Sequence, residues 1–124
     1  MQLEKQKTKK KGKKHAKRRG YMVERKVRMI FKKYGWKTVR AGASLGPVDI
    51  ICIKSGVCLL LQIKSTKKKK FYYYQYLEDN IEKLPFYLVV DFGYGKVRIV
   101  APQKTVCLED GRGLEDFLSR NKFK

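Results

Sequence analysis

Two apolar runs separated by three residues are the feature of this sequence that most restricts its fold. The runs are Val48–Ile53 and Val57–Ile63, and the link between them is Lys54-Ser55-Gly56. The glycine supplies a positive φ at no steric cost, so this spacing predicts a tight antiparallel β-hairpin. The first five residues after the link are apolar on both faces of the strand, which is typical of a central strand covered on both sides.

Helical spacing of three and four residues and strand alternation with period two predict the remaining elements. They are, in chain order, a helix over Gly20–Tyr34, a strand over Trp36–Arg40, a helix from about Tyr73 to Lys83, strands over Phe86–Asp91 and Val97–Val100, and a helix over Gly113–Phe123. With the hairpin, the order is αβββαββα. This order predicts an α/β fold in which helices flank a mixed five-stranded sheet.

The charge of the chain indicates what it binds. In 124 residues there are 31 Lys and Arg against 11 Asp and Glu, a formal charge of +20. Basic side chains release condensed counterions when they bind nucleic acid, so we expect a polyanionic partner. No apolar run approaches the roughly 18 residues of a membrane-spanning helix, and the N-terminus lacks the apolar segment of a secretory signal. The sequence therefore predicts an intracellular protein that does not enter a membrane.

The first 19 residues differ from the rest in composition. Residues 1–19 hold ten Lys or Arg and one acid, Glu4, with almost no apolar content. Such a segment cannot bury enough surface to offset its chain entropy, so we expect a disordered basic arm before a single domain over residues 20–124. The arm either aids solubility or contacts nucleic acid, and the charge of the rest of the chain favours contact. His15 lies in this arm and cannot build a metal site alone.

The cysteines give no sign of a metal site. Cys52, Cys58 and Cys107 are odd in number, lie in apolar settings and lack the spacing of metal ligands. We interpret them as reduced and buried.

Polar residues at the base of the predicted hairpin can carry chemistry. Counted from Ser55, Asp49 lies six residues before the turn and Gln62 seven after it, so an antiparallel pair places them opposite or one residue apart. Lys64 lies on the same strand face as Gln62, because side chains alternate with period two. This is the arrangement that a nuclease needs to hold a divalent metal beside a phosphate.

The oxygen donors available there suit Mg²⁺, which is usually held by one or two carboxylates together with water and phosphate. Asp49 supplies a carboxylate, Gln62 an amide oxygen and Ile63 a backbone carbonyl. Glu24, on the preceding helix, could close the site with a second carboxylate. The alternative is structural, since an Asp at a loop–strand junction is commonly a turn residue and a Lys at a strand end is commonly solvated.

Taken together, several short motifs resemble a known family. They are Glu24-Arg25, the segment Gly35–Arg40, the small-residue loop with Ser44, Val48–Ile51 and Gln62–Ser65. Their order and spacing, from about Gly20 to Val100, resemble archaeal-type Holliday junction resolvases of the PD-(D/E)xK nuclease superfamily. The resemblance implies a restriction-endonuclease-like core in a homodimeric, Mg²⁺-dependent endonuclease, with Mn²⁺ as a substitute metal. Such an enzyme makes paired nicks in four-way DNA junctions by hydrolysis, within an archaeal cell or a virus-infected one.

The resemblance also implies roles for individual residues. Glu24, Asp49 and Gln62 would form the metal site, and Lys64 would orient water or stabilise the transition state. Arg40 matches a phosphate-contacting arginine and Ser44 a serine of the catalytic loop. Gln62 departs from the resolvase pattern, which has Glu, although group I intron homing endonucleases of the superfamily share the Gln-x-Lys variant. Loss of one negative charge should weaken metal binding while leaving an oxygen ligand.

Further basic and aromatic residues are candidates for DNA contact. Arg25 lies on the basic face of the first helix, and the charge run Lys67, Lys68, Lys69 and Lys70 precedes the aromatic run Phe71–Tyr76. The aromatics either stack on bases exposed at a branch point or pack in the core and at a dimer interface, and we favour the second. The two candidates for that interface are the helix expected from Tyr73 and the strand segment Phe86–Val90.

Three functions therefore stay open. The first is a junction-resolving endonuclease. The second is a homing- or restriction-type DNA endonuclease on the same fold, and the third a catalytically weakened junction-binding protein.

Overall fold

The computed structural model describes residues 20–42 and 45–120. The predicted basic arm, residues 1–19, and the predicted catalytic-loop residue Ser44 lie outside this part of the chain. Within it, a helix covers residues 20–33, and Gly35 follows with a φ of 89°. The first predicted helix and its glycine stop are therefore confirmed.

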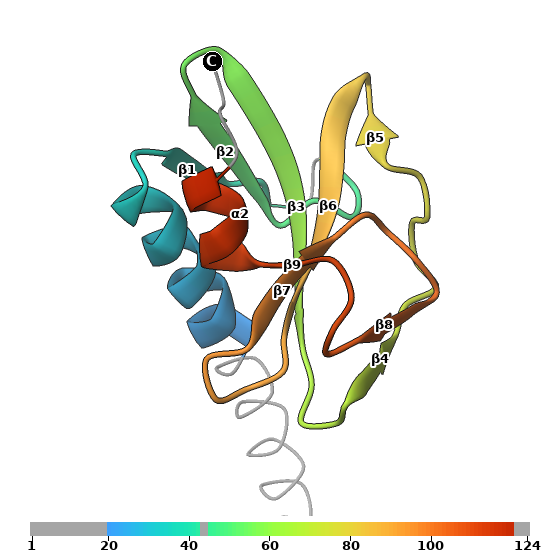
Figure 1. Cartoon of the computed structure of the whole chain (residues 1–124). Helices are drawn as coiled ribbons and strands as arrows, with labels where there is room; N and C mark the ends of the chain where they lie inside the picture. The colour runs from blue at the N-terminus through green and yellow to red at the C-terminus, as the bar shows by residue number, and fades with distance from the viewer. Residues whose placement is uncertain (1–19, 43–44, 121–124) are drawn as a thin grey trace, which may run out of the picture.

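The described residues then form a series of strands and one more helix (Figure 1). They are β1 (Lys37–Arg40), β2 (Ile50–Lys54), β3 (Val57–Ser65), β4 (Lys70–Tyr72), β5 (Asn80–Ile81), β6 (Leu84–Asp91), β7 (Val97–Val100), β8 (Thr105–Cys107), β9 (Arg112–Gly113) and α2 (Leu114–Arg120). The main sheet has the order β1-β2-β3-β6-β7-β9, with β5 beside β6, while β4 and β8 form a separate ribbon. Only β3 and β6 pair in parallel among these strands.

The predicted hairpin is the centre of this sheet. Ser55 and Gly56 turn the chain with φ values of 49° and 80°, and Lys54 pairs with Val57. Two positive φ values in a two-residue turn match the right-handed twist of the flanking strands. β3 lies between β2 and β6, and the middle of the strand is buried, as its apolar run predicts.

The largest core cluster lies between the sheet and the two helices. Val27 and Phe31 from the first helix and Leu114, Phe117 and Leu118 from α2 pack with sheet residues that include Ile50, Cys52, Leu59 and Leu61. The Phe31 ring meets Trp36 edge-to-face at 5.6 Å between centroids. Figure 1 shows both helices on the same side of the sheet, so this side is the helix-covered face.

The other face of the sheet is covered by the ribbon and the segment between β4 and β6. Leu88, Val90 and Val100 pack there against Tyr73 and Val106. A smaller cluster contains Val48, Leu60 and Phe86. The candidate site lies on this second face, because Gln62 and Lys64 alternate with the helix-facing Leu61 and Ile63.

The predicted helix from Tyr73 to Lys83 is wrong. The segment from Tyr73 to Asp79 is irregular, with bends at Gln75 and Asp79, and it ends in the β5–β6 hairpin. The turn residues of this hairpin, Glu82 and Lys83, have φ values of 53° and 67°. Tertiary contacts override the local preference: Tyr76 packs edge-to-face on Phe86 at 5.3 Å between centroids. A backbone hydrogen bond also holds this segment, since the Phe86 N–H donates to the Asp79 carbonyl at 2.9 Å.

Other predictions about the sheet need smaller corrections. The five predicted strands correspond to β1, β2, β3, β6 and β7, and the two-residue strands β5 and β9 extend the sheet to seven. The segment Phe86–Val90 was one candidate for a dimer interface, but β6 lies between β3 and β7, and Phe86 and Val90 are 1% and 0% exposed. A buried central strand cannot offer its side chains to a partner.

Cys52 is buried, as predicted, whereas Cys58 and Cys107 are partly buried; all three are free thiols. Across the described ranges, no helix has the length and apolar character needed to cross a membrane.

Candidate active site

Asp49 stands directly before β2, at the base of the hairpin. Its N–H donates to the Leu61 carbonyl at 2.8 Å, and its Oδ2 accepts a 2.7 Å hydrogen bond from the Ile63 N–H. Ile50 pairs with Leu61, and the same register carried back one residue places Asp49 opposite Gln62. The predicted pairing of these two positions is therefore confirmed, and the Asp49 carboxylate is fixed by the backbone of β3.

Burial raises the pKa of the Asp49 carboxyl above its ordinary value. The hydrogen bond from Ile63 and the positive charge of Lys64 act against this rise, and the negative charge of Glu24 adds to it. Asp49 is thus within electrostatic range of two other predicted site residues, Glu24 and Lys64. A cation placed among them would relieve the cost of burying this carboxylate.

Gln62 is the most enclosed of the predicted site residues, with 5% of its surface exposed. Its Oε1 accepts a hydrogen bond from the Tyr73 hydroxyl, and its Nε2 donates to Gln75 Oε1 at 2.5 Å. Tyr73 and Gln75 were not predicted as neighbours of the site, because both were assigned to a helix. No local pattern marked them, since the irregular path that brings them to Gln62 depends on tertiary contacts.

Glu24 is held by arginines. Its Oε1 accepts a 2.6 Å hydrogen bond from Arg40 Nε and lies 3.8 Å from Arg28 Nε. The Glu24 side chain is 15% exposed and that of Arg40 is 57% exposed. Glu24, the predicted metal ligand, and Arg40, the predicted phosphate contact, therefore form an ion pair in which Arg40 lies on the solvent side.

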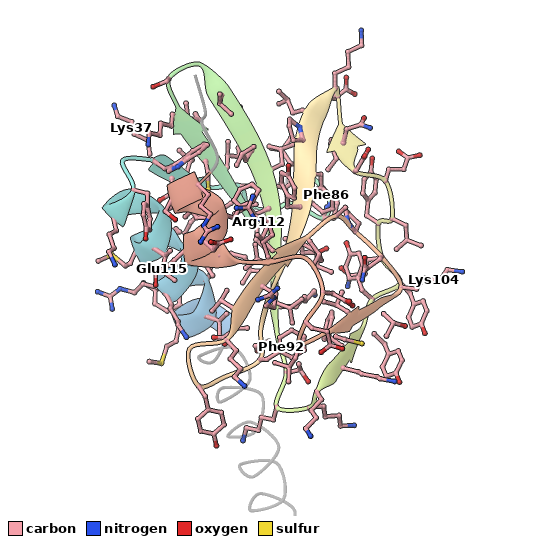
Figure 2. The ribbon with its side chains drawn as sticks, viewed as in Figure 1. Lys37, Phe86, Phe92, Lys104, Arg112 and Glu115 are labelled. Atoms are coloured by element: carbon pink, nitrogen blue, oxygen red, sulfur yellow. The ribbon has the colours of Figure 1, made fainter. Side chains whose placement is uncertain are left out.

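The basic candidates are exposed, as nucleic-acid contact requires. Arg25 lies on the solvent side of the first helix, and Lys67, Lys68, Lys69 and Lys70 are all exposed after β3. Figure 2 shows Lys104, which precedes β8, projecting from the outer side of the ribbon. A basic surface thus adjoins the end of the strand that carries Lys64.

The aromatic run is partly buried and partly exposed. Tyr73 is 2% exposed and Phe71 packs against the same core cluster, which confirms the predicted core role for these two. Tyr72 and Tyr74 are 59% and 68% exposed. Alternation in an extended segment produces this division.

A second polar pair near the site was also missed. Asp91, at the end of β6, is 7% exposed; its Oδ2 lies 3.2 Å from Lys26 Nζ, and its Oδ1 accepts from the Gly93 N–H at 2.8 Å. The Lys26–Asp91 pair joins the first helix to the sheet beside Ser65, which pairs with Asp91. Its only signal in the sequence was an acid at the end of an apolar strand.

The donors near Asp49 suit a hard cation. Within residues 20–42 and 45–120, no group of three or more His, Cys, Asp or Glu side chains is placed to hold a metal ion. The register places the Gln62 amide opposite Asp49, and the Glu24 carboxylate lies within electrostatic range of Asp49. Oxygen donors with one or two carboxylates fit Mg²⁺ or Mn²⁺ and do not favour a thiolate-binding metal.

Three comparisons with known proteins bear on the family and the fold of this chain. The family model of the archaeal Holliday junction resolvase, Hjc, matches residues 15–109. The crossover junction endodeoxyribonuclease Hjc of Methanocaldococcus jannaschii is 34% identical over 70 residues, which cover 56% of this chain and 50% of that protein. The chain thus spans about half the length of the curated relative that it matches.

A solved structure supports the fold. The 1.6 Å structure of Archaeoglobus fulgidus Hjc, described as a Holliday junction resolvase from an archaeal hyperthermophile, matches with a TM-score of 0.64. The match covers 85% of this chain and 99% of the other at 16% identity.

The mixed sheet and its flanking helices therefore define a protein of the restriction-endonuclease-like fold class, as the resemblance implied. Within that class, the chain belongs to the archaeal Holliday junction resolvase family.

Proposed function

We propose that this chain is a structure-selective endodeoxyribonuclease that resolves four-way DNA junctions by paired, metal-dependent phosphodiester hydrolysis. The observation that carries the proposal is the β2–β3 register, which sets Asp49 opposite Gln62 with Lys64 on the same face. Family membership and the charge of +20 support a DNA substrate.

The metal site is proposed to consist of Asp49, Gln62, Glu24 and the Ile63 carbonyl. Mg²⁺, or Mn²⁺ in its place, would polarise the phosphoryl oxygen and lower the pKa of the attacking water. The Ile63 N–H orients the Asp49 carboxylate, since it donates to Oδ2. Lys64 carries a positive charge next to this carboxylate and can stabilise negative charge that develops on the phosphate.

Binding of DNA changes the partners of Arg40 in this proposal. The arginine is exposed and binds Glu24 in the free protein. A DNA phosphate attracts the Arg40 guanidinium away from Glu24. The Glu24 carboxylate is then available to the metal. The exposed side chains of Arg25, Lys67, Lys68, Lys69 and Lys70 contact the DNA backbone, and Ser44 serves in the catalytic loop.

A homodimer follows from the substrate. Two symmetric nicks need two active sites in matched geometry, which a two-fold dimer supplies.

A cleavage assay tests the proposal. We expect the full chain to nick a synthetic four-way junction in Mg²⁺ and to leave a linear duplex of the same sequence largely intact. Asp49→Asn should abolish nicking while junction binding survives, and the exposed Asp79→Asn should cut as the parent does. Equal cutting of the linear duplex would instead support a homing- or restriction-type endonuclease, and full activity of Asp49→Asn would exclude this site.

A second candidate is a junction-binding protein with weakened catalysis. The neutral side chain at position 62 and the Glu24–Arg40 ion pair favour it, because both lower the negative charge offered to a metal. Junction binding without cleavage in Mg²⁺ or Mn²⁺ would support this candidate. Gln62→Glu should then bind Mg²⁺ more tightly and gain cleavage.

A further inference from the structure

The Gln62 amide is held at both ends by side chains from the segment after β4. The Tyr73 hydroxyl donates to Gln62 Oε1, and Gln62 Nε2 donates to Gln75 Oε1 at 2.5 Å. The Tyr73 oxygen in turn accepts a 3.2 Å hydrogen bond from the Tyr76 N–H. Tyr73 is 2% exposed and packs with Leu88 and Val90 on β6. The hydroxyl is thus fixed by the core as well as by its hydrogen bonds.

The Tyr73 hydroxyl is the donor of this pair, since a phenol is protonated at neutral pH. The oxygen end of the Gln62 amide therefore faces the Tyr73 hydroxyl, and its nitrogen end faces Gln75.

The orientation of this amide decides whether it can bind a cation. A carboxylate offers oxygen in either orientation, but an amide has one oxygen end and one NH₂ end of nearly the same shape. An unrestrained Gln62 could turn its NH₂ group toward Asp49 and donate to the carboxylate, in competition with a metal. A chain with Gln at this position therefore needs a device that fixes the amide.

We propose that Tyr73 and Gln75 are positioning residues that fix the oxygen end of Gln62 for a divalent cation at Asp49. The inference rests on the metal site of the proposed function. Tyr73 acts through Gln62 and does not itself touch the metal or the DNA. The irregular path from Tyr73 to Gln75, in place of a helix, is what brings both side chains to the amide.

Metal binding without DNA tests this proposal directly. Mn²⁺ affinity of the full chain is measured by titration calorimetry for the parent, Tyr73→Phe and the matched control Tyr72→Phe. Loss of an outer hydrogen bond to a ligand typically weakens metal affinity by about tenfold or more. We expect a loss of that order in Tyr73→Phe and none in Tyr72→Phe, whose side chain is 59% exposed.

A double-mutant cycle shows whether Tyr73 acts through Gln62. Gln62→Met removes the amide at nearly constant volume, so Tyr73→Phe added to it should cause no further loss of affinity. Losses that add, or an unchanged affinity in Tyr73→Phe, would overturn the proposal. If Tyr73→Phe does not fold, as judged by circular dichroism, the exposed Gln75→Ala replaces it, and an unchanged Mn²⁺ affinity in that variant is equally decisive.

The outcomes separate this inference from the proposed function. A parent that binds Mn²⁺ through Asp49 but cuts no junction contradicts the function alone. A parent that cuts junctions, with Mn²⁺ affinity unaffected by Tyr73→Phe, contradicts the positioning role alone. A parent whose Mn²⁺ binding is the same in Asp49→Asn contradicts both.

Discussion

Arg40 Nε donates a 2.6 Å hydrogen bond to Glu24 Oε1 across the space between β1 and the first helix. In the proposed function, Arg40 contacts a phosphate and Glu24 binds the metal. Because the two side chains pair with each other, this ion pair would couple metal binding to DNA binding.

Loss of Arg40 should affect the two ligands in opposite directions. Arg40→Gln removes the cation that competes for Glu24, so we expect Mn²⁺ affinity without DNA to rise about two- to fivefold, the scale of an exposed ion pair. Junction affinity should fall, because a phosphate contact is lost. Titration calorimetry and gel-shift assays measure the two quantities.

Lys37→Gln is the charge-matched control for this variant. Lys37 lies on the same strand and projects into solvent (Figure 2), so its loss should leave Mn²⁺ affinity unchanged. If Arg40→Gln and Lys37→Gln bind Mn²⁺ equally, Glu24 is not a ligand.

Asp49 should lower the stability of the metal-free protein. Burial raises the pKa of its carboxyl in the folded state, so ionisation at neutral pH favours the unfolded chain. Asp49→Asn keeps an acceptor for Ile63 and removes this cost, so we expect a higher Tm than the parent at about pH 7 with a chelator present. The difference should shrink as the pH falls toward the ordinary pKa of aspartate, about 3.9. A Tm gain that does not depend on pH would contradict this explanation.

The lysine run should contribute to the salt dependence of junction binding. Log affinity falls with log salt by about 0.9 per phosphate neutralised on duplex DNA. Replacement of Lys68 and Lys69 by Gln should reduce that slope by up to about twice this amount. Lys83→Gln, in the β5–β6 turn beside Glu82, serves as the control and should not change it. A double variant with the parental slope would show that these lysines do not touch phosphates.

Two glycines with similar φ values should respond very differently to alanine. Gly111 has a φ of 63°, and a Cβ there would lie 2.2 Å from Val100 Cγ1 and 2.3 Å from the Ile99 carbonyl oxygen. Gly56 has a φ of 80° with no atom within 4 Å of the Cβ position. We expect Gly56→Ala to cost about 1–2 kcal/mol for its left-handed backbone, and Gly111→Ala to cost about 1–3 kcal/mol more for overpacking. Urea denaturation measures both, and equal losses would contradict the close contact.

The hairpin and the active-site register were predictable because the signals are local. Two apolar runs and the link Lys54-Ser55-Gly56 define the β2–β3 turn, and the distances of Asp49 and Gln62 from the turn then determine their pairing. No other part of the fold needs to be known for this step.

The segment after β4 was not predictable in the same way. Its turn uses Glu82 and Lys83 at positive φ, where Asn-Gly would have been the recognisable signal. Its non-helical path depends on the hydrogen bond from the Tyr73 hydroxyl to Gln62 and on the ring contact between Tyr76 and Phe86. Both contacts join residues that are distant in sequence. Such contacts form only in the folded chain and leave no local pattern in the sequence. The neighbours of Gln62 could therefore not be predicted.

The parallel pairing of β3 with β6 has a consequence for the order in which the molecule assembles. The β2–β3 hairpin closes a two-residue turn, and hairpins form in roughly microseconds. Docking of β6 must first close the loop over residues 66–83, which costs more chain entropy and delays the step. Pulsed hydrogen exchange should therefore protect the Asp49 amide before the amide of Val89, which pairs with Ile63 across β3 and β6. The reverse order would refute this sequence of events. In this order of folding, the hairpin sets Asp49 opposite Gln62 before Tyr73 and Gln75 can form hydrogen bonds with the Gln62 amide. The orientation of that amide is therefore among the last features of the site to be fixed.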